Sequence, residues 1–131
     1  MILIDTSAIL PVLDKNDVIH YQAAEIWREL IEEKKEIWIN NYILLEATTL
    51  IQRRYGMEIV RNFQQRMAPI FQVEWINAIK HTQATEILLS TNRRKLSLVD
   101  ISAFATMRRL GIRQVFTFDQ HFAEQGFEVL P

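Results

Sequence analysis

Short apolar runs alternate with amphipathic, helix-like stretches along the whole chain. Each run is three to six residues long, which suits a buried strand better than a helix. The five runs are residues 2–4, 37–39, 71–76, 115–118 and 127–130. A helix between two strands returns the chain to the same edge of a sheet, so this order predicts a mostly parallel sheet with helices on both faces. We therefore predict an α/β fold: a three-layer α/β/α sandwich with about five central strands.

Capping and helix-ending residues predict where the helices begin and end. Asp5 follows the first run and can cap a short helix. Ser97 and Asp100 form an S-x-x-D pair that is close to a capping box. Gly56 and Gly111 each follow a helical stretch, as C-terminal glycines do. The predicted helices span residues 6–13, 21–33, 42–55, 58–68 (before Pro69), 82–89 and 97–110.

Length and composition indicate one globular domain over residues 1–131. Only three Gly and three Pro occur, which leaves no flexible linker that would divide the chain. The absence of cysteine excludes disulfides, thiolate catalysis and cysteine-based zinc or iron–sulfur sites. The N-terminus lacks a secretory signal, and no apolar run approaches the roughly 20 residues that span a bilayer. We expect a cytoplasmic protein without membrane contact.

Four acidic residues stand where a parallel sheet would bring them together. Asp5 and Asp119 follow two strands, Asp100 lies in the first turn of a helix, and Glu46 lies within an apolar helix. Ligands bind beyond the carboxyl ends of the strands in such sheets, so these four carboxylates are expected to converge at that edge. Taken singly, each aspartate is better explained as a helix cap than as a catalytic group. Glu46 is not, because a glutamate among apolar neighbours needs a partner for its charge.

Convergent carboxylates repel one another unless a cation neutralises them, and at least one of them should then have a raised pKa. Because the chain has no cysteine and no histidines at ligand spacing, the implied ion is a hard, oxygen-binding one. Mg²⁺ or Mn²⁺ fits this donor set best. Such ions bind phosphate oxygens and activate water for hydrolysis.

Four segments together resemble the motifs of PIN-domain nucleases. They are residues 2–7 (ILIDTS), 44–47 (LLEA), 96–100 (LSLVD) and 116–122 (FTFDQHF), and they occur in the family's order over essentially the whole chain. The size of the chain is similar to that of the VapC-type toxins of bacterial and archaeal toxin–antitoxin pairs.

The resemblance implies hydrolysis of RNA phosphodiester bonds in the presence of Mg²⁺ or Mn²⁺. It implies that Asp5, Glu46 and Asp100 are the core metal-site acids and that Asp119 is the fourth. It also implies an RNA substrate, a small antitoxin as partner and a homodimer. Three hydroxyl residues fall where the family often has groups that orient the site and meet substrate: Thr6, Ser7 and Thr117.

Basic residues flank two of the acidic motifs, although the formal net charge of −1 gives no overall attraction to nucleic acid. Arg93 and Arg94 precede the Asp100 helix and are candidates to hold substrate phosphates. Arg53 and Arg54 are interpreted instead as a solvated helix end, where cations complement the dipole. His121 is interpreted as a surface residue, and the three tryptophans (Trp27, Trp38 and Trp75) as core. Phe104, Met107 and Leu110 suit either the core or a dimer face.

Two other classes of protein share parts of this pattern. Receiver and haloacid-dehalogenase domains also open with a strand and an aspartate. They fit poorly, because Ser7 stands where the second haloacid aspartate would be and the 113–118 strand has no lysine. A non-catalytic PIN-like domain that binds RNA or protein through the same groove is the remaining alternative, and a requirement for metal would distinguish the two.

Overall fold

The computed structural model describes residues 1–131, and its centre is a five-stranded sheet with every neighbouring pair parallel. The strand order is β3-β2-β1-β4-β5. The strands are β1 (Ile2–Ile4), β2 (Ile37–Asn40), β3 (Gln72–Glu74), β4 (Gln114–Phe116) and β5 (Glu128–Leu130). The central strand, β1, is entirely buried, which agrees with its uninterrupted apolar sequence. The predicted fold class, including the number of strands, is confirmed.

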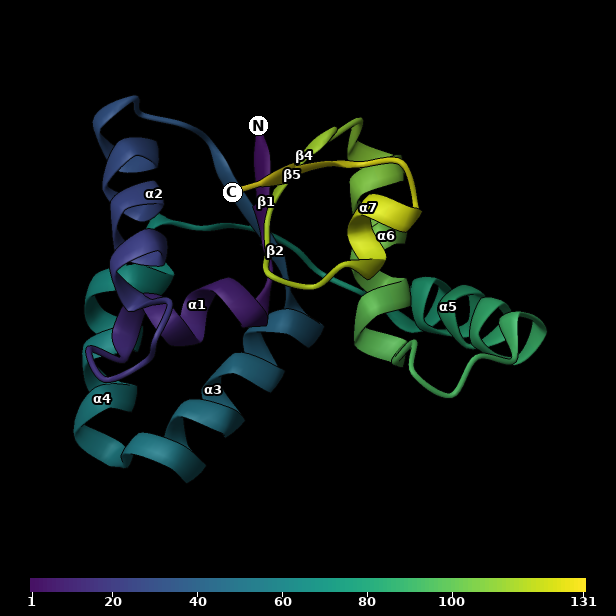
Figure 1. Ribbon diagram of the computed structural model, residues 1–131. Coiled ribbons are helices and arrows are strands. Elements are labelled where there is room, and N and C mark those ends of the chain that lie inside the picture. Colours follow the sequence, from purple (N-terminus) through teal and green to yellow (C-terminus); the bar gives the residue numbers. More distant parts are fainter.

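Helices cover both faces of this sheet (Figure 1). One layer holds α1 (Thr6–Leu13), α2 (His20–Glu32) and α4 (Met57–Asn62). The other holds α5 (Ala78–Thr91), α6 (Leu98–Leu110) and the short α7 (His121–Glu124). Helix α3 (Asn41–Tyr55) leaves the carboxyl end of β2 and packs against both α1 and α6. None of the helices combines the length and the apolar content that crossing a bilayer would require.

Capping residues stand at several helix ends in the structure. Asp5 is the N-cap of α1, and Asn40 is the N-cap of α3. Ser97 and Asp100 form a complete capping box at the start of α6, and Gly56 and Gly111 end α3 and α6. These signals are local in sequence, which is why they could be read without knowledge of the fold.

Several predicted boundaries differ from the structure. Helix α5 is longer than the predicted 82–89, because Asn77 caps it at residue 78. The helix after Gly56 continues beyond α4 through a π-helical segment (η1, Phe63–Met67) into a 3-10 turn (η2, Ala68–Ile70). Helix α7 was not predicted, since its four residues are too short to show a period.

The burial of the apolar side chains decides the role of the α6 face and tests the prediction that the three tryptophans are core residues. Phe104 and Met107 are buried among the core residues, so α6 does not offer them as a dimer face. Trp27 and Trp38 pack against the core as predicted, but Trp75 is 65% exposed and that prediction is wrong. Glu74 takes the inward position at the end of β3, and the alternation of a strand turns the next residue, Trp75, outward.

Candidate active site

The sheet reverses its strand order beside β1, and the candidate site lies at that point. Strands β1 and β4 are neighbours although β2 and β3 lie between them in sequence. Asp5 leaves the carboxyl end of β1 and its N–H donates to the Phe116 carbonyl of β4 at 3.0 Å. Asp119 follows the carboxyl end of β4. A reversal of this kind leaves a crevice at the carboxyl edge of a parallel sheet, where ligands bind.

Two hydroxyls join the start of α1 to the segment that follows β4. Ser7 Oγ donates to Asp5 Oδ2 at 2.7 Å, and Thr117 Oγ1 donates to the same oxygen at 3.0 Å. The backbone N–H of Phe118 donates to Ser7 Oγ, and that of Asp119 donates to Thr117 Oγ1, both at 2.9 Å. The Asp5 carboxylate and the backbone that carries Asp119 are therefore held in one hydrogen-bonded unit.

Asp5 is a carboxylate in a nearly closed environment, with 5% of the residue exposed. Burial raises the pKa of its carboxyl to about 6. The hydrogen bonds from Ser7 and Thr117 oppose this rise, and the charge of Asp100 adds to it. The predicted raised pKa is thus found, but desolvation is a larger cause than repulsion between carboxylates.

Glu46 and Asp100 come to the same place from two helices. Glu46 lies on α3, whose N-terminus is capped by the side chain of Asn40 at 2.9 Å from Ile43 N. Asp100 lies in the first turn of α6, where its Oδ2 accepts from the Ser97 N–H at 3.0 Å. Both residues are half-buried, and neither forms an ion pair within the chain.

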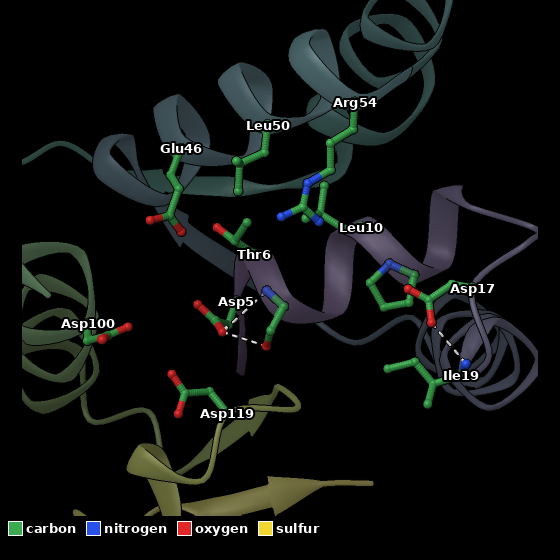
Figure 2. Close-up of a pocket in the computed structure, with 12 residues that line it drawn as sticks. Asp5, Thr6, Leu10, Asp17, Ile19, Glu46, Leu50, Arg54, Asp100 and Asp119 are labelled. Atoms are coloured by element: carbon green, nitrogen blue, oxygen red, sulfur yellow. Dashed lines mark hydrogen bonds between the residues drawn. The ribbon is translucent and has the colours of Figure 1, made fainter. Parts of the chain in front are cut away.

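The four acidic residues line one groove of about 370 Å³, which also includes Thr6 and Ser7. In Figure 2, Asp5, Glu46, Asp100 and Asp119 approach one another from four different elements. Ligand atoms of Asp100, Asp119 and His121 lie within 4.8 Å of one another. The sequence prediction includes four of the five acids that line the groove, the fifth being Asp17. It does not include His121, for which the D-x-H spacing at the start of α7 was the available signal.

His121 contacts Asp119 in two ways. Its backbone N–H donates to Asp119 Oδ1 at 2.9 Å, and its Nδ1 lies 2.8 Å from the same oxygen. The Nδ1 contact is not aligned as a hydrogen bond, and this buried atom has no hydrogen-bond partner. His121 Nδ1 and Asp119 Oδ1 are thus close enough for an ion pair, which forms only when the imidazole is protonated.

The donor atoms that line the groove are of the kind that binds a hard divalent cation. Carboxylate oxygens dominate it, and the chain has no thiolate that would favour a softer metal. Thr6 Oγ1 is buried beside them and has no partner in the protein. A cluster of carboxylates together with an unpaired buried hydroxyl is an environment that a hydrated cation would satisfy.

The basic residues are distributed differently from the prediction. Arg93 pairs with Glu124 at 3.3 Å and faces a separate small hollow beside Phe104, while Arg94 is exposed. The arginine that lines the acidic groove is Arg54, which had been interpreted as a solvated helix end. The packing of α3 across α1 places it there. Its spacing of eight residues from Glu46, which puts both on one face of the helix, was the available signal.

Comparisons with known proteins agree with the architecture. The PIN domain family model matches residues 2–128. The 23S rRNA-specific endonuclease VapC20 of Mycobacterium tuberculosis, from strains CDC 1551 / Oshkosh and H37Rv, is 33% identical over 133 residues, covering 100% of this chain and 99% of the relative.

Two solved structures have the same fold. The crystal structure of the M. tuberculosis VapC20, described as a sarcin-ricin loop cleaving toxin, is 32% identical with a TM-score of 0.86, covering 100% of both chains. FitAcB from Neisseria gonorrhoeae, at 17% identity, has a TM-score of 0.72 over 100% of this chain and 97% of that one. Together with the family match, these likenesses show that the chain belongs to the PIN domain family of nucleases.

Proposed function

We propose that this protein is an endoribonuclease that hydrolyses RNA phosphodiester bonds with Mg²⁺ or Mn²⁺ held by Asp5, Glu46, Asp100 and Asp119. The observation that carries the proposal is the convergence of these four residues in one groove at the carboxyl edge of the sheet. Full-length similarity to a 23S rRNA-specific endonuclease supports ribosomal RNA as the substrate class.

Each residue has a distinct role in this proposal. A bound Mg²⁺ or Mn²⁺ supplies positive charge at the phosphodiester and lowers the pKa of water for hydrolysis. Ser7 and Thr117 keep the Asp5 carboxylate in one orientation through their hydrogen bonds to Oδ2. The buried hydroxyl of Thr6, which has no partner in the protein, would hydrogen-bond to a water molecule held with the cation. Ser7 also lines the groove, whereas Thr117 is buried and acts only through Asp5. Arg93 and Arg94 provide outer contacts to RNA.

We also propose that the protein is the toxin of a toxin–antitoxin pair and acts in the cytoplasm as one domain, residues 1–131. Similarity over the whole length of VapC20 supports the toxin role, and a cellular RNA substrate supports the location. A small antitoxin would inhibit the protein by placing a basic side chain, such as an arginine, among the groove carboxylates.

A homodimer is proposed through an exposed apolar surface that includes Leu45, Trp75 and Ile79, which are 68%, 65% and 70% exposed. These residues come from neighbouring segments, because Tyr42 on α3 contacts His81 on α5 and Asn41 bonds to Ile76. A second copy is the proposed occupant, because a twofold dimer would cover the same exposed apolar residues on both copies.

The activity is tested with purified protein and 23S rRNA. We expect cleavage with Mn²⁺ or Mg²⁺, none with EDTA, and losses of orders of magnitude in Asp5→Asn, Glu46→Gln and Asp100→Asn. Glu86→Gln, an exposed acid on α5, is the matched control and should retain wild-type activity. Unchanged cleavage in all three groove variants would refute the site. Expression of the wild type alone should slow bacterial growth, and Asp5→Asn should relieve it.

A further inference from the structure

The groove continues from its acidic end to a second end that carries Arg54. Glu46, Leu50 and Arg54 follow one another at intervals of four residues, so they share one face of α3. All three line the groove, as do Thr6 and Leu10 on the facing α1. Figure 2 shows the three α3 side chains in a row, with the Arg54 guanidinium reaching over Leu10. The groove therefore has a carboxylate end, an apolar middle and a cationic end.

Arg54 is available for a ligand. No carboxylate lies within 4.0 Å of its guanidinium, whereas Arg28, Arg93 and Arg109 each have such a partner. Asp17 is the one acidic residue at this end of the groove, and its Oδ1 accepts the Ile19 N–H at 3.0 Å. The hydroxyl of its neighbour Tyr55 is in contact with it. A guanidinium without a carboxylate partner at a groove wall matches a phosphate, which it binds through two parallel hydrogen bonds.

The spacing along α3 separates this position from the acidic centre. Eight residues of helix between Glu46 and Arg54 correspond to about 12 Å. This rise places Arg54 and the carboxylates at opposite ends of the groove. It suits a flanking phosphate of the same strand, with the intervening sugar and base over the apolar middle formed by Leu10, Pro11 and Leu50.

We propose that Arg54 binds a phosphate flanking the cleaved bond and so fixes the register of single-stranded RNA in the groove. This inference rests on the proposed ribonuclease function. Arg54 is a binding residue here and takes no part in the bond-breaking step. Its loss should weaken substrate binding while leaving the acidic centre intact.

Arg53 provides a matched control on the same turn of α3. Both arginines are exposed and lie in the last turn of the helix, so both complement its dipole equally, but only Arg54 lines the groove. Substitution of either one by glutamine should lower the melting temperature by the same small amount. Any difference in KM or salt dependence between the two variants then measures a contact between Arg54 and RNA.

The probe is a stem–loop RNA copied from the site at which the wild type cleaves 23S rRNA. Arg54→Gln should raise KM about tenfold, the loss expected for one charge-assisted contact in an open groove, with kcat nearly unchanged. The slope of log(kcat/KM) against log[salt] should become shallower by about 0.7, the value for one single-strand phosphate. Arg54→Lys should recover the slope but only part of the KM, and the Mn²⁺-induced rise in melting temperature should not change.

A second set of measurements identifies which flanking phosphate Arg54 contacts. Flanking phosphates are replaced one at a time by uncharged methylphosphonates. One such position should weaken the wild type and Arg53→Gln but have no further effect in Arg54→Gln, which is the non-additivity expected of a contacting pair. Equal KM and salt slopes in Arg54→Gln and Arg53→Gln would overturn the inference. Absence of cleavage by the wild type would instead overturn the proposed function.

Discussion

The side chain of Asn40 donates a hydrogen bond to Thr106 Oγ1 of α6 at 3.1 Å. Asn40 lies at the end of β2 and is completely buried. The same Nδ2 also donates to Ser102 Oγ at 3.1 Å, and the Oδ1 atom accepts from Ile43 N as the N-cap of α3. One amide thus connects the helix that carries Glu46 with the helix that carries Asp100. This amide is therefore placed to fix the position of one groove acid relative to the other.

Asn40→Ala should therefore affect stability and metal binding together. Loss of the cap costs about 1 kcal/mol, and buried hydroxyls left without a donor raise the total to about 2–3 kcal/mol. The rise in melting temperature on adding Mn²⁺ should also shrink, because α3 and α6 no longer share a fixed anchor. Denaturant titration and thermal scans measure both effects.

The control is Asn77→Ala, which removes the equivalent cap from α5, where Asn77 Oδ1 accepts from Lys80 N at 3.0 Å. This exposed site lies outside the groove, so we expect a loss of about 1 kcal/mol with an unchanged Mn²⁺ response. A normal Mn²⁺ response in Asn40→Ala would show that Asn40 supports the fold without positioning the acids.

Much of this site could be predicted because its determinants are local or follow from a topological rule. Asp5 and Asp119 follow apolar strands, Asp100 is in a capping box, and parallel strands place such ends at one edge. The partners of Asn40 and the reach of Arg54 over α1 could not be predicted. Both arise where helices distant in sequence pack together. The cap at Asn40 and the four-residue spacing from Glu46 to Arg54 are visible in the sequence, but they do not show which helix each side chain meets.

Glu74 extends the same buried network to β3 and gives the protein an acid-sensitive contact. It accepts from Thr106 Oγ1 at 2.8 Å and from Arg109 at 2.6 Å and 3.3 Å. Burial alone would raise the pKa of Glu74, but the hydrogen bonds from Arg109 and Thr106 and the charges of Arg109 and Lys80 together lower it. A lowered pKa means that the contribution of Glu74 to stability is present above its unfolded pKa, 4.5.

We expect this contribution to be lost as the pH falls from 4.5 through the lower pKa of the folded state. Glu74→Gln should lose about 1–3 kcal/mol at pH 7, because Arg109 then lacks its charged partner. Its stability should also fall less steeply with acid than that of the wild type. Urea titrations between pH 3 and 7 test this, with Glu128→Gln at an exposed strand residue as the control. Parallel pH curves for Glu74→Gln and the wild type would contradict the assignment.

The proposed dimer surface makes a separate prediction. Ile79→Asp places a charge at a residue that is 70% exposed, so the monomer should fold with nearly unchanged stability. If two copies meet through this surface, the substitution buries an unpaired charge and dissociates them. Light scattering coupled to gel filtration should give the mass of a dimer for the wild type and of a monomer for the variant. Val18→Asp, at a fully exposed residue outside this surface, should remain dimeric.

The raised pKa of Asp5 predicts how metal and pH act on the folded protein. The folded carboxyl takes up a proton near pH 6 and the unfolded one near 3.8, so the metal-free protein loses stability as the pH rises between these values. A difference of this size corresponds to about 3 kcal/mol above pH 6. Asp5→Asn removes the buried charge and keeps an oxygen for Ser7 and Thr117. In EDTA at pH 7.5 it should melt above the wild type, and this advantage should disappear as the pH falls towards 4.

Mn²⁺ should reverse that order. A cation that binds only the folded wild type stabilises it by about 2.7 kcal/mol at a hundredfold excess over its dissociation constant, which is several degrees in melting temperature. Asp5→Asn should gain little, because it lacks the central ligand. Asp14→Asn is the control: Asp14 accepts from Tyr55 Oη at 3.1 Å and does not line the groove, so its Mn²⁺ shift should equal that of the wild type. Thermal scans of the three proteins at pH 7.5, with EDTA and with Mn²⁺, are sufficient. An equal Mn²⁺ shift in Asp5→Asn and the wild type would place the cation away from Asp5, since a ligand stabilises the fold only through contacts that the fold provides.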